Sequence, residues 1–302
     1  MSDMVPIKIV YLGSPEFAAA ILEHLIMHSK LYQVVGVVTN PDKPVGRKQA
    51  LTESPVARVA NQHHLPLFKP AELSPANLAH IKLLGADIFL VAAFGKIIPP
   101  GWLKAPGKAT LNIHFSLLPK YRGALCVSEA IRNGDQQTGV TLMEMDEQLD
   151  HGPIIAQEKV QITDRDDVAT LTQRLTETSF NLIDNNLPDY MAGKLIPLPQ
   201  DETRVTLTPS YKNRDHRSAF VAWKLITDAI AGQNATKVSC LIRSLNPDPG
   251  AWTKVKTRDG EIEFRLIAAG VETDRLVIYQ VQLPAKAPIN WQQFLAGHLL
   301  EN

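Results

Sequence analysis

Asn112 and His114 are two polar side chains in a mostly apolar segment, residues 111–119, and Asp150 follows 36 residues after His114. An amide can polarise a carbonyl group, an imidazole can carry a proton, and a carboxylate can orient the imidazole and fix its tautomer. Alternate residues of a strand point to the same face, so Asn112 and His114 would act side by side. These residues predict a site that activates a carbonyl and moves a proton. The alternative is that Asn112 and His114 only form hydrogen bonds with the backbone at the end of the strand and have no chemical role.

Three carboxylates in the segment 145–152 compete for the third role: Asp146, Glu147 and Asp150. Only Asp150 is followed by a residue and then a glycine, which is a turn signal. A side chain on such a turn can approach a neighbouring strand end from a loop. We therefore expect Asp150, in preference to Asp146, to orient the imidazole.

Short apolar runs alternate with helix-type patterns through the first two thirds of the chain, as in parallel strand–helix–strand units. We expect strands at 7–12, 33–38, 87–94, 109–114, 138–145 and 154–160, and helices at 17–28, 54–62, 124–133 and 169–192. The fold class predicted is α/β and Rossmann-like, with a mostly parallel sheet and flanking helices. Ligands of such sheets bind at the carboxyl ends of the strands, where His114 precedes a Leu-Leu-Pro turn.

The pattern changes after residues 197–208, a polar segment with two prolines that we interpret as a linker. Helical patterns at 220–230 and 237–245 precede short strand-type runs at 251–256, 262–268 and 275–283. Short strands separated by turn signals are typical of a small β-barrel, here an OB-like one. The predicted domains are a catalytic domain, 1–204, and a smaller OB-like domain, 205–302.

The composition excludes several classes of protein. The 302 residues are 45% hydrophobic and 21% charged with a formal net charge of zero, which disfavours a general polyanion binder. The start has no signal-peptide pattern, no segment suits a membrane span, and Cys126 and Cys240 lack metal-type spacing. We expect a cytoplasmic monomer without a membrane partner. The first turn, Gly-Ser-Pro-Glu-Phe, lacks the glycines of a dinucleotide site, so nicotinamide and flavin cofactors are not expected.

A basic segment at 39–49 carries Lys43, Arg47 and Lys48 among two prolines and a glycine, without an apolar period. This pattern is typical of an exposed, mobile loop near the carboxyl edge of the sheet. Three cations on such a loop could contact a phosphate backbone. The alternative is a solvated surface loop with no ligand.

Several of these stretches resemble those of one known family, the folate-dependent formyltransferases, and the resemblance covers nearly the whole chain. It rests on Gly-Ser-Pro-Glu-Phe-Ala at 13–18, Ala-Phe-Gly-Lys-Ile-Ile-Pro at 93–99, and Asn-Ile-His-Phe-Ser-Leu-Leu-Pro-Lys-Tyr-Arg-Gly at 112–123. It also includes residues 138–152, which contain Asp150. Within the family, the basic loop at 40–47 resembles that of the members that act on initiator tRNA.

The resemblance implies a role for each candidate residue. Asn112, His114 and Asp150 would be the catalytic residues, and no metal would be required. Two groups of residues would line the site for 10-formyltetrahydrofolate: Ser116, Leu117, Leu118 and Pro119, and Phe94, Gly95 and Ile97. The acceptor implied is the amino group of methionine on initiator methionyl-tRNA, whose phosphates would meet Lys43, Arg47 and Lys48.

Two alternatives stay open beside this interpretation: a sugar-nucleotide amine N-formyltransferase with the same folate donor, and a folate- or RNA-binding protein without turnover. Three departures from the family pattern bear on them. Residues 122–128 are Arg-Gly-Ala-Leu-Cys-Val-Ser where the family usually has Arg-Gly-Ala-Ala-Pro-Ile-Gln, and Asp248 replaces an aromatic residue between two prolines. Only a turn fits between 269 and 275, so the last domain is expected to be shortened.

Overall fold

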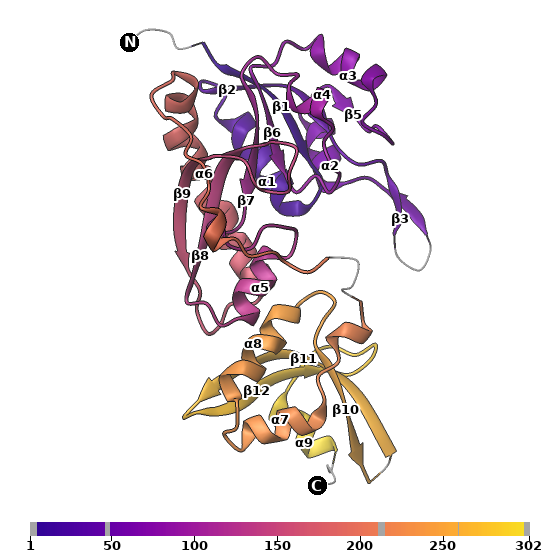
Figure 1. Ribbon diagram of the computed structural model, residues 1–302. Helices are drawn as coiled ribbons and strands as arrows, with labels where there is room; N and C mark the ends of the chain where they lie inside the picture. The colour runs from indigo at the N-terminus through magenta and orange to yellow at the C-terminus, as the bar shows by residue number, and fades with distance from the viewer. Residues whose placement is uncertain (1–4, 46–48, 211–214, 259, 299–302) are drawn as a thin grey trace. The chain divides into compact units, whose positions relative to one another are not determined.

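The computed structural model describes residues 5–45, 49–210, 215–258 and 260–298 (Figure 1). The chain divides into two compact units, which are described separately. The first contains Met1–Arg122, Gly139–Val160 and Gln173–Thr206, and the second contains Gly123–Thr138, Gln161–Thr172 and Leu207–Asn302. The second unit thus includes two short segments that the sequence analysis assigned to the catalytic domain. The domain boundary at residue 204 stays a prediction.

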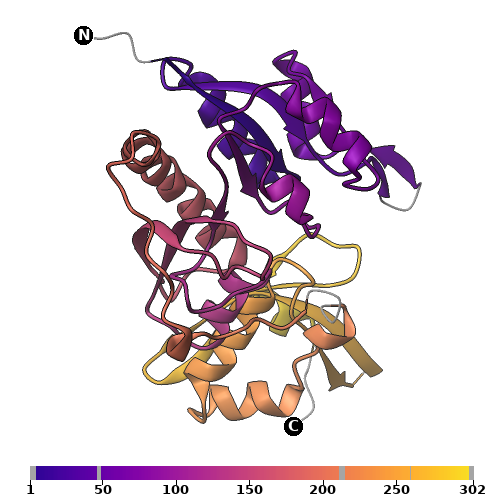
Figure 2. The same cartoon turned by 45° about the horizontal axis from the view of Figure 1, so that its top comes forward.

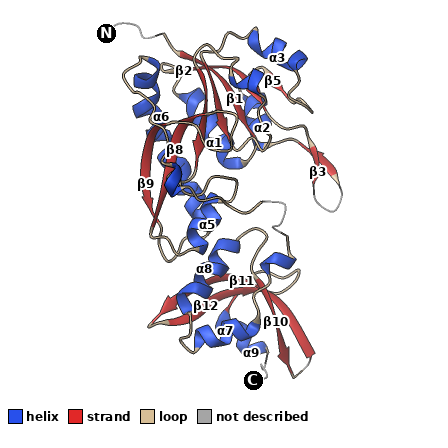
Figure 3. Ribbon diagram, viewed as in Figure 1, coloured by secondary structure: helices blue, strands red, loops and turns tan. Residues whose placement is uncertain are grey.

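A seven-stranded sheet with the order β5-β2-β1-β6-β7-β8-β9 forms the centre of the first unit (Figures 1 and 3). Its strands are β1 Ile7–Gly13, β2 Tyr32–Val38, β5 Leu67–Phe68, β6 Ile88–Ala92, β7 Ala109–His114, β8 Gln137–Glu144 and β9 Ile154–Gln161. Strands β5, β2, β1, β6 and β7 are parallel, and β8 is antiparallel to β7. The mostly parallel α/β sheet predicted from the sequence is confirmed.

Helices cover both faces of this sheet because its central strands are apolar on both sides. They are α1 Glu16–Met27, α2 Pro55–Gln62, α3 Pro75–Lys82, α4 Pro100–Leu103 and α6 Val168–Met191. On one face, Leu12 of β1 packs in a core with Trp102 of α4. On the other, the Tyr11 hydroxyl donates to the Ala18 carbonyl of α1 at 2.6 Å. No helix among the described residues is long and apolar enough to cross a membrane.

The order of the strands reverses between β1 and β6, because β2 and β5 extend the sheet to one side and β7 to the other. At such a switch point, the loops that follow the two central strands diverge and leave room for a ligand. The loops after β1, β2, β6 and β7 therefore meet at one edge of the sheet. Asn112 and His114, near the end of β7, lie at this edge.

The basic segment forms more regular structure than its sequence indicates. Lys43–Val45 (β3) pairs antiparallel with Ala50–Thr52 (β4), so these residues form two short strands within the segment that the sequence analysis expected to be an exposed, mobile loop. The strands are three residues long and their described side chains are exposed. They therefore lack the alternation of buried and exposed residues by which a strand is identified from sequence. Arg47 and Lys48 lie outside the described residues.

The second unit is built on a four-stranded antiparallel sheet with the order β10-β11-β12-β13 (Figure 2). The strands are β10 Trp252–Thr257, β11 Gly260–Glu272, β12 Arg275–Gln282 and β13 Ile289–Asn290, and the helices are α5 Cys126–Arg132, α7 Trp223–Ile230, α8 Ala235–Leu245 and α9 Trp291–Gly297. The predicted β module is confirmed as a sheet, and its closure into a barrel stays a prediction. Thr273 and Asp274, both with positive φ, form the tight turn expected between β11 and β12.

Gly139 of β8 lies where the backbone of β9 leaves no room for a side chain. A Cβ atom added there would lie 2.2 Å from the Glu158 carbonyl oxygen of β9 and 2.5 Å from a methyl group of Leu117. We predict that Gly139→Ala lowers the free energy of unfolding by about 2–3 kcal/mol, because the strands must separate. Denaturant unfolding measures this. Gly101→Ala is the matched control, since its nearest neighbour would be 3.8 Å away, and equal effects of the two substitutions would contradict the prediction.

Candidate active site

The structure brings together the three residues that the sequence singled out. Asn112 and His114 are 8% and 7% exposed on β7, and Asp150 lies on the loop between β8 and β9. The Asn112 side-chain amide donates to Asp150 Oδ1 at 3.3 Å, and His114 Nδ1 lies 3.6 Å from Asp150 Oδ2. An amide, an imidazole and a carboxylate therefore share one partly buried position.

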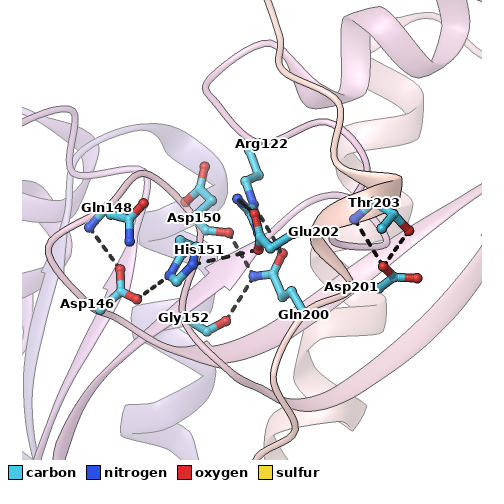
Figure 4. A network of polar contacts seen from close by, with 10 residues as sticks. All are labelled: Arg122, Asp146, Gln148, Asp150, His151, Gly152, Gln200, Asp201, Glu202 and Thr203. Carbon is cyan, nitrogen blue, oxygen red and sulfur yellow. Dashed lines mark hydrogen bonds and ion pairs between the residues drawn. The ribbon is translucent and has the colours of Figure 1, made fainter.

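Asp146 has a different role from Asp150. Its carboxylate accepts a hydrogen bond from the backbone N–H of Gln148 at 2.8 Å and pairs with His151 Nδ1 at 2.5 Å (Figure 4). These contacts are local to the loop, so Asp146 shapes the turn that carries Asp150. Asp150 is the carboxylate that lies beside Asn112 and His114, and its functional role stays a prediction.

The hydrogen bond of His114 Nε2 determines which of the two ring nitrogens can act as a base. His114 Nε2 lies 2.9 Å from the backbone carbonyl oxygen of Tyr121. A carbonyl oxygen can only accept, so Nε2 carries the hydrogen and Nδ1, which faces Asp150, carries the lone pair of the neutral ring. The sequence analysis expected Asp150 to fix the tautomer. In the structure the Tyr121 carbonyl fixes it, and Asp150 is placed to stabilise the protonated ring.

Gln200 stabilises the loop that carries Asp150. Its side-chain amide donates to the carbonyl oxygens of Asp150 and Gly152, both at 2.8 Å (Figure 4). Asp150 has φ +48°, a left-handed conformation that is costly for a residue with a side chain. Position 152 accepts only glycine, because a Cβ there would lie 2.1 Å from the Glu144 carbonyl oxygen. The two bonds from Gln200 help to hold this strained loop in place.

Arg122 in turn positions Gln200. The buried guanidinium donates to Gln200 Oε1 from Nε at 3.1 Å and from Nη2 at 2.9 Å. It also donates to the carboxylate of Glu202 at 2.6 and 3.2 Å, and this hydrogen bonding lowers the pKa of Glu202 (Figure 4). Glu202 therefore stays ionised and helps to keep Arg122 in its fork geometry.

Residues 197–206 are not the linker that the sequence suggested. Leu198 pairs with Ile154, and Thr206 accepts from the Arg122 backbone N–H at 2.9 Å and from the Tyr121 backbone N–H through its hydroxyl at 2.8 Å. The segment is a packed strap of the first unit. Its hydrogen bonds join individual polar atoms to backbone groups far away in the sequence. A polar composition that includes prolines does not reveal such bonds. Gln200 was missed for this reason, whereas Arg122 lay in a stretch that carried the family resemblance.

The turn after β7 contains the first group of predicted folate residues. Ser116 is fully buried, and its hydroxyl donates to the Lys120 carbonyl at 2.6 Å. The Thr141 hydroxyl donates to the Ser116 carbonyl at 2.6 Å, and Gln157 donates to the Leu118 carbonyl at 2.9 Å. Leu117 and Pro119 are partly exposed. Thr141 and Gln157, which the sequence analysis did not single out, therefore fix this turn.

The loop after β6 contains the second group. Phe94 is 2% exposed and packs in the core, whereas Gly95 and Ile97 are exposed, Ile97 at 92%. Asn40 ties this loop to its neighbours, since its side-chain amide donates to the Phe94 carbonyl at 2.7 Å and to the Ser14 hydroxyl at 2.8 Å. The loops after β1, β2 and β6 are thus joined through one amide.

Residues 7–186 match the sequence model of the family described as formyl transferase. The chain is 39% identical over 245 residues to the methionyl-tRNA formyltransferase of Levilactobacillus brevis, covering 81% of this chain and 74% of that protein. It is 36% identical over 312 residues to the methionyl-tRNA formyltransferase of Staphylococcus aureus strain Newman, covering 96% of each.

Solved structures share the fold at lower identity. A sugar 3N-formyl transferase, WlaRD, crystallised with dTDP and 5-N-formyl-THF, matches with a TM-score of 0.58 and 18% identity over 94% of this chain and all of that chain. HypX from Aquifex aeolicus in complex with tetrahydrofolic acid matches with a TM-score of 0.61 and 17% identity, over 96% of this chain and 47% of that one. These similarities show a common fold.

We predict that Gln200→Ala destabilises the Asp150 loop. The substitution removes the hydrogen bonds of Gln200 to the Asp150 and Gly152 carbonyls and to the Arg122 guanidinium, which costs about 2–3 kcal/mol in the free energy of unfolding. Denaturant unfolding and amide hydrogen exchange of residues 146–152 measure the effect. Gln173→Ala, on the exposed side of α6, is the control. Unchanged exchange in the loop of the Gln200 variant would contradict the role assigned to this residue.

Proposed function

The chain belongs to the formyl transferase family, and from this premise we propose that it transfers the formyl group of 10-formyltetrahydrofolate to the amino group of initiator methionyl-tRNA. The observation that carries the proposal is the convergence of Asn112, His114 and Asp150 at one buried position. The relatives named methionyl-tRNA formyltransferase support the choice of acceptor, because one of them aligns with 96% of this chain.

Each catalytic residue has a task that its geometry supports. The Asn112 amide has two N–H groups, of which Asp150 accepts one, and the amide can donate to an oxygen on which negative charge develops. One such donor is worth about 3–4 kcal/mol of transition-state stabilisation. His114 takes the proton of the attacking amine on Nδ1, and Asp150 stabilises the charged ring. His114 can then return the proton to the leaving nitrogen.

The residues at the carboxyl edge fit a folate. 10-Formyltetrahydrofolate supplies an activated formyl group, and its ring system needs an open apolar wall beside the catalytic residues. Gly95 is exposed with open space where a Cβ would project, and Ile97 is exposed on the same loop. Leu117 and Pro119 are partly exposed on the turn after β7. These positions support the assignment of the two groups of folate residues.

The pair of strands β3 and β4 supports contact with an RNA backbone. Lys43 is exposed on β3, and the chain continues from this strand into the segment that carries Arg47 and Lys48. Cations that neutralise phosphates release counterions, so binding through them weakens steeply with salt. We propose that these three cations contact the tRNA near its acceptor end.

We predict that Asn112→Ala lowers kcat about 10²–10³-fold and His114→Ala about 10²–10⁴-fold, with little change in the KM for tRNA. The reason is that both side chains act on the transition state rather than on tRNA binding. The assay is formyl transfer to methionyl-tRNA under saturating folate donor. Asn77→Ala, on α3, is the control, with a partly exposed side chain that donates only to the Glu72 carbonyl among the described contacts. Full turnover by either catalytic variant would refute the mechanism.

We predict that Lys43→Ala raises the KM for tRNA and reduces the slope of log KM against log salt by about one, as expected for the loss of one phosphate contact. Steady-state kinetics at several salt concentrations measure this slope. Lys30→Ala is the control, because Lys30 is exposed and precedes β2, at the opposite edge of the sheet. Equal slopes for the two variants would show that Lys43 does not contact the RNA.

The proposal is tested by offering both acceptors in parallel: charged initiator methionyl-tRNA and a 4-amino-sugar nucleotide, each with 10-formyltetrahydrofolate. Salt-sensitive formylation of the tRNA is the result expected. Formylation of the sugar alone would replace the proposed acceptor and keep the catalytic residues. Formylation of neither would overturn the proposed acceptor class.

A further inference from the structure

A group of metal-ligating side chains lies between α1 and α6, within the first unit. His24 and His28 are one helical turn apart at the end of α1, and Asp184 is on α6. His24 Nε2 is 3.0 Å from Asp184 Oδ2, and His28 Nε2 is 3.9 Å from the same oxygen. One ligand atom from each of the three residues lies within 4.8 Å of the others. None of these residues takes part in the proposed formyl transfer.

The outer contacts of this group resemble those around metal ligands. His28 Nδ1 donates to the His24 backbone carbonyl at 2.8 Å, which leaves the lone pair of the neutral ring on Nε2, toward Asp184. The second oxygen of Asp184 accepts from the Tyr32 hydroxyl at 2.9 Å. Burial and the adjacent carboxylate raise the pKa of Tyr32, so its hydroxyl remains a donor. Such outer hydrogen bonds orient both histidine and carboxylate ligands in metal sites.

Packing fixes the His24 ring in its position in the absence of a bound ion. The His24 ring is 12% exposed and stacks on Phe180, with ring centroids 4.4 Å apart and planes within 4°. The Asp184 side chain is 25% exposed and that of His28 is 43% exposed, so one side of the group is open to solvent. A cation can therefore reach the site without a rearrangement of the helices.

We propose that His24, His28 and Asp184 form a binding site for a divalent transition-metal ion of the zinc type. Ligand atoms around tetrahedral zinc are about 3.3 Å apart, which lies between the two distances to Asp184 Oδ2. On binding, the metal ion takes the place of the hydrogen between His24 Nε2 and Asp184 Oδ2, and the neutral His24 ring carries its hydrogen on Nδ1. Water completes the coordination on the open side, and the ion links α1 to α6.

The test is a titration of the purified full-length protein, treated with EDTA and dialysed, with zinc chloride in a calorimeter. We expect one ion per chain with a Kd in the micromolar range or tighter, and a rise in Tm of several degrees when zinc is in excess. Cobalt(II) absorption reports the ligand geometry independently. Absence of binding at millimolar zinc would overturn the proposal.

Variants identify the ligands. His28→Gln and Asp184→Asn should each weaken zinc binding by at least about 100-fold, and Tyr32→Phe, which removes only the outer hydrogen bond, by about tenfold. His80→Gln is the matched control, an exposed histidine on α3. Equal zinc binding by the His28 and His80 variants would mean adventitious binding elsewhere and would overturn the assignment. The test does not depend on formyl transfer, so its outcome is independent of the proposed function.

Discussion

The antiparallel pairing of β7 with β8 is the constraint on which the site depends. Glu144, the last residue of β8, pairs with Leu111, whereas His114 pairs with Thr141. The chain therefore leaves β8 beside the start of β7, and the following loop must fold back for Asp150 to reach the end of that strand. The left-handed backbone of Asp150 is part of this reversal, and the loop carbonyls it exposes need partners.

The strap at residues 197–206 provides those partners. The Gln200 amide satisfies two loop carbonyls, and Arg122 satisfies the Gln200 oxygen. The outer ion pair contributes less to stability, because Glu202 is 57% exposed and exposed ion pairs are worth about 0–1 kcal/mol. Leaving a buried polar group without a partner costs about 1–3 kcal/mol, so the fork between Arg122 and Gln200 dominates. The strap is thus part of the structure that positions Asp150.

The placement of His114 shows how backbone geometry can set the tautomer of an imidazole. The Tyr121 carbonyl, on a residue with φ +62°, holds one ring nitrogen, and the other faces Asp150. The backbone of the next turn thereby decides the tautomer before substrate binds. Preorganisation of this kind lowers the cost of charge development, since no group must reorient during the reaction.

The sequence by itself determined the α/β class, the positions of β7 and α6 to within about a residue, and the identity of the three residues that meet at the site. It could do so because burial on both faces and alternation along a strand leave local patterns. Only the tertiary structure decided that Tyr121 fixes the tautomer, that residues 43–45 pair with residues 50–52, and that Gln200 belongs to the site. These features depend on single hydrogen bonds between backbone and side chains far apart in the sequence, or on short exposed strands. The same holds for His24, His28 and Asp184, which come together through the packing of α1 against α6.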